Sequence, residues 1–147
     1  MKRLLFLTIA TIFLASCATY EAPTLSTSET LDFTHSKVAA EEYWIPAKLV
    51  TPKYPVSIAK DKVAGCSRFK ISINSDGKTV NAELIEAYPT DAFIAPSVAA
   101  VKKWVWKPTS KNEERVEITR MVQLDFYIPD AKNYAQAKGY CAVGTQF

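Results

Sequence analysis

The feature that most constrains this chain is an alternating stretch of side chains that leads into a tight turn and a second such stretch. Phe69, Ile71 and Ile73 alternate with Arg, Lys and Ser, which predicts a strand with one buried and one solvated face. Residues 74–77, Asn-Ser-Asp-Gly, predict a turn because Asn and Asp bond to local backbone and Gly accepts a positive φ. A second strand is predicted over residues 79–86, completing an antiparallel hairpin. Its shared face is expected to hold Val80, Ala82 and Leu84.

Helical patterns precede and follow this hairpin. The first is predicted over residues 55–62, where Pro55 suits the first position of a helix. The second is predicted over residues 91–104, and Pro96 near its start predicts a late or irregular beginning. Residues at spacings of three and four define its buried side: Phe93, Ser97, Ala100, Val101 and Trp104.

A long third strand is predicted over residues 115–128. Its apolar face holds Val122, Leu124, Phe126 and Ile128. Arg120 shares the parity of this apolar set, so a bulge near Arg120 or an exposed first half of the strand is expected. The order helix, strand, strand, helix, strand predicts an α+β fold: a small two-layer sandwich of a three-stranded antiparallel sheet with two helices on one face.

The N-terminus has the architecture of an export signal. The basic pair Lys2-Arg3 precedes an apolar run over residues 4–14, and small residues follow it. The run is shorter than the roughly 20 apolar residues that a transmembrane helix needs. Residues 14–17, Leu-Ala-Ser-Cys, resemble the lipobox of bacterial lipoproteins.

This resemblance implies that residues 1–16 are removed and that Cys17 is lipidated. The alternative is an ordinary secretory signal in which Cys17 has no role. Ala18 follows the cysteine, which, by resemblance to lipoprotein sorting in enteric bacteria, implies a lipid anchor in the outer membrane facing the periplasm. Apart from the covalent lipid on Cys17, no cofactor is expected.

The predicted organisation has four parts. Residues 1–16 are a signal peptide, residues 17–42 are the lipidated cysteine with a flexible tether, residues 43–130 are the folded domain, and residues 131–147 are a C-terminal tail. The tether is predicted from its Ser, Thr and Ala content and its few large apolar side chains. The stretch at residues 41–49 is either a short strand or an arm packed on the domain.

Two cysteines remain once Cys17 is assigned to the lipid. An exported domain with two spare cysteines is expected to join them, so Cys66 and Cys141 predict a disulfide; two unrelated thiols are the alternative. Cys66 is out of phase with Phe69 and therefore lies on the face away from the helices. A tail that ends in Cys141 is expected to fold under the sheet and cover that face.

The domain resembles the C-terminal domain of TonB-family energy transducers over residues 52–128. The matching residues, in order, are Pro52, Tyr54-Pro55, Gly65, Asp76-Gly77, Phe93, Ala100, Lys103-Trp104, Lys107-Pro108, Val122, Leu124, Phe126 and Ile128. Three residues depart from the family: Pro96 and Ser97, where the family places alanines, and Ser67, where it places an apolar residue. The expected lipid anchor also departs from the transmembrane helix of the energy transducers.

The resemblance implies a TonB-like periplasmic module that binds extended peptides of envelope proteins, including those of outer-membrane receptors. The peptide would add as a further strand to the edge of the last strand. The outward residues of that strand are the predicted partner-binding set: Arg115, Glu117, Thr119, Gln123 and Asp125. One alternative is a charged edge that only discourages aggregation. Another is a structural envelope lipoprotein that braces partners or contacts peptidoglycan without energy transduction.

Other classes of function find little support in the sequence. The formal net charge of +3 includes Lys2 and Arg3, so it does not provide the basic field that nucleic-acid binding requires. His35 is the single histidine, and no cluster of side chains has metal-ligand spacing. No phosphate-binding loop or nucleophile motif is present. We therefore expect neither an enzyme nor a protein with a small-molecule substrate.

Overall fold

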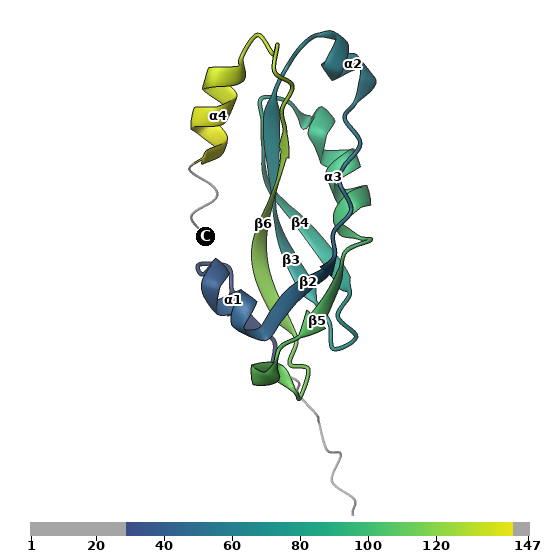
Figure 1. Ribbon diagram of the computed structural model, residues 1–147, viewed down its shortest axis with the longest axis vertical. Coiled ribbons are helices and arrows are strands. Elements are labelled where there is room, and N and C mark those ends of the chain that lie inside the picture. The colour runs from purple at the N-terminus through teal and green to yellow at the C-terminus, as the bar shows by residue number, and fades with distance from the viewer. Residues whose placement is uncertain (1–28, 143–147) are drawn as a thin grey trace, which may run out of the picture.

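The computed structural model describes residues 29–142, and within them a four-stranded sheet forms the centre of the molecule (Figure 1). Its strand order is β1-β6-β3-β4, with β1 at Leu31–Phe33, β3 at Gly65–Ile73, β4 at Thr79–Tyr88 and β6 at Ile118–Phe126. The β6-β3-β4 part is antiparallel, as predicted, whereas β1 pairs with β6 in parallel. The α+β fold is confirmed, but the sheet has a fourth strand that the sequence did not indicate.

The predicted hairpin is β3 and β4. Gly77 has a φ of 72° in the turn between them. The register shifts between Ser72 and Ile73, so that Ile73 pairs with Thr79 while Ser72 pairs with Asn81. Because of this shift, Val80 has no paired residue on β3, and it is 58% exposed. The expectation that Val80 shares a face with Ala82 is therefore wrong, because a bulge breaks the alternation.

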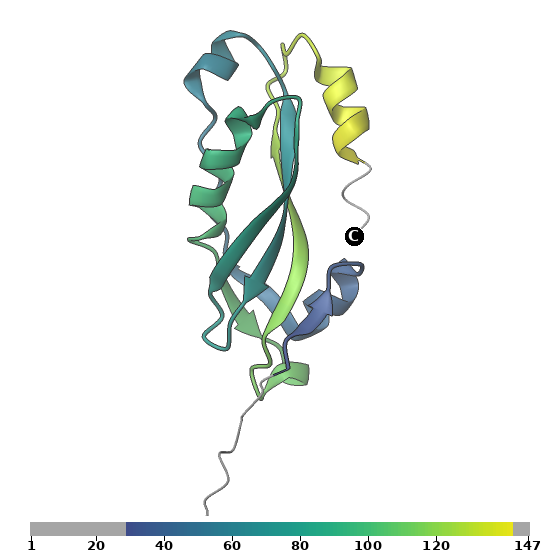
Figure 2. The ribbon, with the colours of Figure 1, turned by 180° about the vertical axis from the view of Figure 1, so that it is seen from behind.

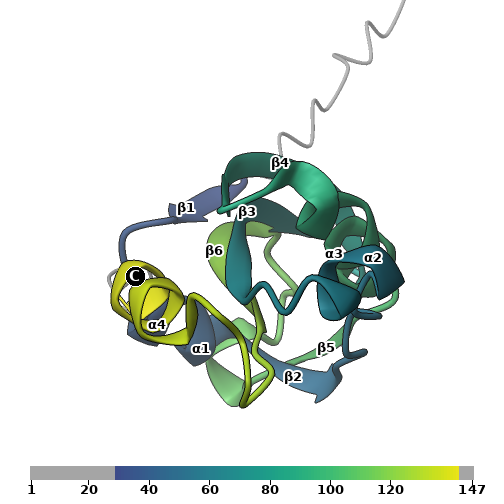
Figure 3. The ribbon, with the colours of Figure 1, turned by 90° about the horizontal axis from the view of Figure 1, so that it is seen from above.

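Two helices cover one face of the sheet, as predicted (Figure 3). They are α2 at Val56–Lys60 and α3 at Ile94–Val101, and a 3₁₀ turn at Asp91–Phe93 precedes α3. The irregular start predicted from Pro96 is present in this turn. All five residues predicted for the inner side of this segment are buried: Phe93, Ser97, Ala100, Val101 and Trp104.

The core lies between these helices and the inner face of the sheet. Phe69, Ile71 and Ile73 of β3 are fully buried, and Phe93 stacks on Phe126 with ring centroids 4.3 Å apart. Gly65 begins β3 because a Cβ there would lie 1.9 Å from the carbonyl oxygen of Tyr88. The apolar residues of the hairpin thus meet the helix that follows it, as hydrophobic burial requires.

Two of the departures from the family pattern contact each other inside this core. Ser67 and Ser97 are both fully buried, and the Ser67 hydroxyl donates to the Ser97 Oγ over 2.7 Å. A buried hydroxyl needs such a partner, because an unpaired one loses its hydrogen bonds to water. Each hydroxyl therefore provides the hydrogen-bond partner that the other needs.

A second, two-stranded sheet closes one end of the core. It pairs β2 at Trp44–Lys48 with β5 at Val105–Pro108 in antiparallel fashion. Of the stretch at residues 41–49, residues 44–48 therefore form a strand rather than an arm, and residues 41–43 belong to the preceding helix. Residues 105–108 form the partner of β2, a strand that the sequence did not indicate. Trp44 and Trp106 face inward, and both are nearly inaccessible.

The tether predicted over residues 17–42 is wrong for its second half. Residues 31–33 form β1, and α1 at Lys37–Tyr43 begins at the Ser36 cap, whose Oγ accepts from Ala39 N–H over 3.2 Å. Ala40 of α1 is fully buried in the core. Small and hydroxyl-bearing residues resembled a linker, but here they supply a helix cap and a close-packed contact. Cys17 and the predicted signal peptide lie outside the described residues.

On the side of the sheet away from α3, α4 at Tyr134–Ala142 lies near one end of the sheet and α1 lies near the opposite end (Figures 1 and 2). The predicted disulfide is confirmed: Cys66 of β3 and Cys141 of α4 are joined. The Asn133 side chain also bonds to both the N–H and the C=O of Ala64, over 2.8 and 2.9 Å. The segment predicted as a tail thus contains a helix that covers the outer face of the sheet. None of the helices within residues 29–142 is long and apolar enough to cross a membrane.

Candidate functional site

The exposed edge of β6 is the part of the sheet that the sequence singled out, and the structure divides it in two. At the N-terminal end, Ile118–Arg120 pair with β1. Beyond Arg120, β6 continues to Phe126 while pairing only with β3. The expectation of an open edge along the whole strand is therefore wrong for Ile118–Arg120, and within the described chain it holds for residues 121–126.

The pairing with β1 shows which residues of this open segment point their backbone N–H and C=O groups outward. Leu31 N–H donates to the carbonyl of Glu117 over 3.0 Å, so the odd-numbered residues turn their backbone groups toward β1. Strand alternation then points the N–H and C=O of Met121, Gln123 and Asp125 away from β3. These three residues offer a template to which another strand can bond.

The predicted partner-binding residues fall into two groups. Arg115 and Glu117 precede β6 and contact the hairpin turn, where Arg115 Nη1 donates to the Ser75 carbonyl over 3.2 Å. Thr119 pairs with Asp32 of β1. Gln123 and Asp125 lie at the other end, beside α4. The structure thus does not bring the five residues together on one surface, because β1 and α4 cover different parts of β6.

Gln123 and Asp125 belong to a polar network under α4. Gln123 accepts from Arg68 Nε over 2.9 Å and donates to the Cys141 carbonyl over 3.0 Å and to Asp125 over 2.7 Å. Arg68 also pairs with Glu86 over 2.7 Å. Burial raises the pKa of the Asp125 carboxyl, and the Gln123 hydrogen bond and the Arg68 charge oppose that shift. These side chains hold α4 in place, which limits their freedom to contact a partner.

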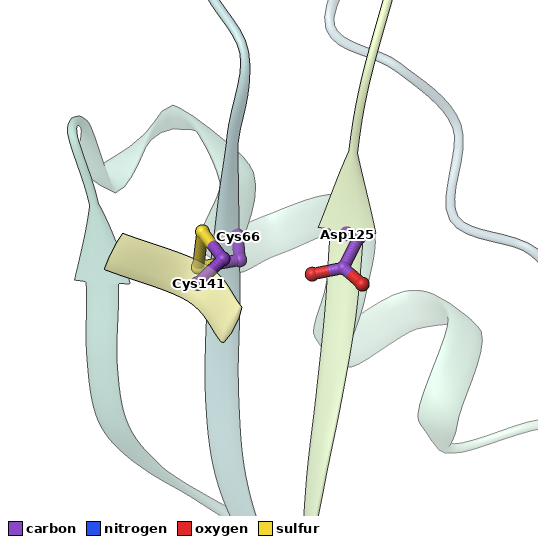
Figure 4. Close-up of side chains that lie close together, drawn as sticks. All are labelled: Cys66, Asp125 and Cys141. Atoms are coloured by element: carbon purple, nitrogen blue, oxygen red, sulfur yellow. A yellow bond between two sulfur atoms is a disulfide. The ribbon is translucent and has the colours of Figure 1, made fainter. Parts of the chain in front are cut away.

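Cys66, Cys141 and Asp125 are the one group of potential metal ligands found between residues 29 and 142 (Figure 4). Their ligand atoms lie within 4.8 Å of one another. The two sulfurs are bonded to each other, however, and a metal ligand must be a thiolate. The arrangement is that of a structural disulfide beside a carboxylate.

A groove runs beside the open part of β6. It has a volume of about 250 Å³ and lies between α1, the β2 segment and β6. Met121, Val122 and Gln123 form its β6 wall, and Trp104 and Trp106 lie on its inner side. A strand added to β6 would lie along this groove, so that its side chains could enter the hollow.

Arg120 lies in this groove and was missed as a site residue. It pairs with Ile71 in an unbroken register with β3, so neither the predicted bulge nor the predicted exposure exists. The residue is 4% exposed, and its guanidinium lies 5.1 Å from the centre of the Trp106 ring. Its Nη2 is 3.7 Å from Glu41 of α1. In the sequence, Arg120 stood out as a charged residue at a position that alternation assigns to the apolar face of the strand. Its partner Glu41 was not foreseen, because it lay in the segment interpreted as a tether.

The sequence model of the family described as Gram-negative bacterial TonB protein C-terminal matches residues 50–128. The solution NMR structure of the Pseudomonas aeruginosa TonB CTD matches with a TM-score of 0.52 and 19% identity, over 69% of this chain and 97% of that chain. That likeness shows the shared fold. No curated protein matches the sequence.

Proposed function

Because this chain belongs to the family of Gram-negative bacterial TonB C-terminal domains, we propose that it binds an extended segment of a partner envelope protein by adding a strand to residues 121–126 of β6. Family membership supports a TonB-like protein-interaction module of the periplasm rather than an enzyme. The proposed site rests on one observation. The strand β1 ends at Phe33, opposite Arg120, whereas β6 continues to Phe126. Backbone groups supply affinity in this mode, and alternate side-chain pockets supply specificity.

The position of the groove supports the same mode. Leu49, which lines the groove, is 55% exposed although it is large and apolar. Arg115, Glu117 and Thr119 lie along the β1 end and would contact a partner only at its edge. Gln123 and Asp125 flank the added strand on the α4 side. We therefore expect a short peptide of a receptor or another envelope protein to occupy the groove, with no small-molecule substrate involved.

A photocrosslinking experiment tests the site. A benzophenone amino acid is introduced at Leu49, and at Val80 of β4 as a control of similar exposure, 58%. The full-length protein is irradiated in living cells. We expect capture of an envelope protein from position 49 and not from position 80.

Backbone variants test the mechanism on the same sample. Met121→Pro removes one outward N–H of β6, and proline is tolerated where that group faces away from the sheet. Met121→Ala removes the side chain and keeps the N–H. Capture from position 49 should be lost with proline and kept with alanine, provided that both variants melt within a few degrees of the parent. Equal capture by both would contradict strand addition, and capture of cell-wall fragments alone would favour the structural lipoprotein.

We further propose that the protein is anchored by lipid on Cys17 in the outer membrane, facing the periplasm. The support is the run of residues 4–14 followed by Leu-Ala-Ser-Cys, with Ala18 after the cysteine. Two or more acyl chains give stable anchoring. Labelling with a palmitate analogue should mark the parent protein and not Cys17→Ala. Fractionation of the labelled membranes then tests the outer-membrane assignment.

A further inference from the structure

Arg120 has hydrogen-bonding capacity that the described protein does not use. Its side chain is 5% exposed, and its Nε and Nη1 atoms are buried without a hydrogen-bond partner among residues 29–142. Leaving charged donors unpaired in a buried position is costly, so such groups call for an explanation. The ring of Trp106 offsets part of this cost by contacting the guanidinium face. That contact leaves the N–H groups of Nε and Nη1, which lie in the plane of the guanidinium, without an acceptor within residues 29–142.

The charges around the groove favour an anion. Lys37, Arg68 and Arg120 line it, Arg68 being paired with Glu86, and Glu41 is the one acidic residue that lines it within residues 29–142. Glu41 is shared between two cations, since it lies 3.7 Å from Arg120 and 3.9 Å from Lys37. Burial lowers the pKa of the Arg120 guanidinium and Glu41 opposes the shift. An arginine nevertheless stays protonated under physiological conditions.

We propose that the groove recognises a carboxylate side chain on the partner segment and that Arg120 binds it. This inference rests on the proposed strand addition and specifies the chemistry of the partner. The planar guanidinium presents donors in a fork that matches the two oxygens of a carboxylate. Arg120 and Val122 project from the same face of β6, so the carboxylate belongs to the partner residue beside Val122.

Two capped peptides provide the probes. Each has seven residues that alternate Thr and Val, with a central Glu in one and a central Gln in the other, so that the central side chain shares the Val face. Capping removes terminal charges that Arg120 could bind. Binding to the full-length protein in detergent is followed by the amide shifts of β6 and by the Arg120 Nε–H signal. We expect the Glu peptide to bind at least about tenfold more tightly, as a charge-assisted hydrogen bond to a buried donor implies.

Two variants assign that preference to Arg120. Arg120→Met should abolish the difference between the peptides by weakening Glu-peptide binding to the level of the Gln peptide. Glu41→Gln removes the competing carboxylate and should increase the preference for the Glu peptide. The second variant tests the inference even if the first unfolds. Equal binding of both peptides to the parent protein, or a preference that survives Arg120→Met, would overturn the carboxylate site.

A titration with acetate separates this inference from the proposed function. If neither peptide binds but acetate shifts the Arg120 Nε–H signal, strand addition fails and the anion site is supported. If the peptides bind equally well and acetate leaves that signal unchanged, strand addition is supported and the anion site fails. If neither peptide nor acetate produces a response, both proposals are overturned.

Discussion

The two faces of the central sheet are held to the rest of the protein by different forces. The inner face packs Phe69, Ile71 and Ile73 against α3 and its preceding turn, with one hydroxyl pair inside an otherwise apolar contact. The outer face meets α4 through the Cys66–Cys141 disulfide and a network of charges and amides. Hydrophobic burial thus forms one layer, and a covalent bond fixes the other.

This difference reflects what each helix can bury. In α3, Ser97, Ala100 and Val101 are all buried, whereas only Ala137 and Cys141 of α4 are. A helix with so little apolar area cannot dock by hydrophobic burial alone, because each buried methylene contributes only about 0.8 kcal/mol. The disulfide and the polar contacts therefore take the place of a second core.

Truncation of Phe69 should have the largest effect and show that the inner face carries the stability. Phe69→Ala removes a fully buried ring from the centre of β3. The expected loss is about 3–5 kcal/mol of unfolding free energy, from lost burial and the cavity left behind. Urea denaturation measures it. Val80→Ala, on the exposed bulge, is the matched control and should change stability little.

Loss of the disulfide should come next and act mainly on the outer face. The double variant Cys66→Ala/Cys141→Ala removes a crosslink between two residues that are 75 positions apart in the sequence. We expect roughly 2–4 kcal/mol of destabilisation. Hydrogen exchange should show faster opening of α4 than of α3. Equal loss of protection in both helices would mean that the two faces do not behave as separate layers.

The buried serine pair should respond less, and not additively. Ser67→Ala or Ser97→Ala alone leaves one buried hydroxyl without its partner, at a cost of about 1–2 kcal/mol each. The double variant removes both hydroxyls and should lose less than the sum of the two. A double-mutant cycle in urea measures the coupling. Additive losses would show that the 2.7 Å hydrogen bond does not connect the two sites.

The smallest effect is expected at Asp125 and depends on pH. Burial raises its pKa in the folded protein above the unfolded value, so the folded state binds the proton more tightly. Stability therefore falls as pH rises from the unfolded pKa through the raised folded pKa. Asp125→Asn should be slightly more stable than the parent at neutral pH. The difference should vanish in acid below both pKa values, as thermal unfolding at several pH values would show.

The elements that the sequence predicted share strong local periodicity. The β3–β4 hairpin and the buried side of α3 follow from alternation and from spacings of three and four. The disulfide followed from counting cysteines in a chain predicted to be exported. By contrast, β1 has only three residues, and its parallel pairing with β6 is a contact between distant segments. Short strands of this kind have no periodicity of their own to detect.

The candidate site was predicted less well than the fold, because it too depends on contacts between segments that are distant in the sequence. The sequence singled out β6, the strand that has an open edge over residues 121–126, but its pairing with β1 and the contact between Glu41 and Arg120 arise from tertiary structure. An arginine in an apolar phase suggested a local irregularity of the strand. In the folded protein, a tryptophan face and a carboxylate from another helix accommodate the charge without any bulge. Local patterns cannot reveal such a distant partner.

The β1 strand also fixes the point on β6 at which an added strand would have to begin. It pairs in register up to Phe33 opposite Arg120, and the chain then turns into α1, so a strand added to β6 cannot slide past that point. Six residues of β6 remain, a length of about 20 Å at the usual rise per residue. The end of β1 would therefore fix the position of a bound segment along β6. The spacing of side chains along that segment, and not only their chemistry, would decide which partners fit.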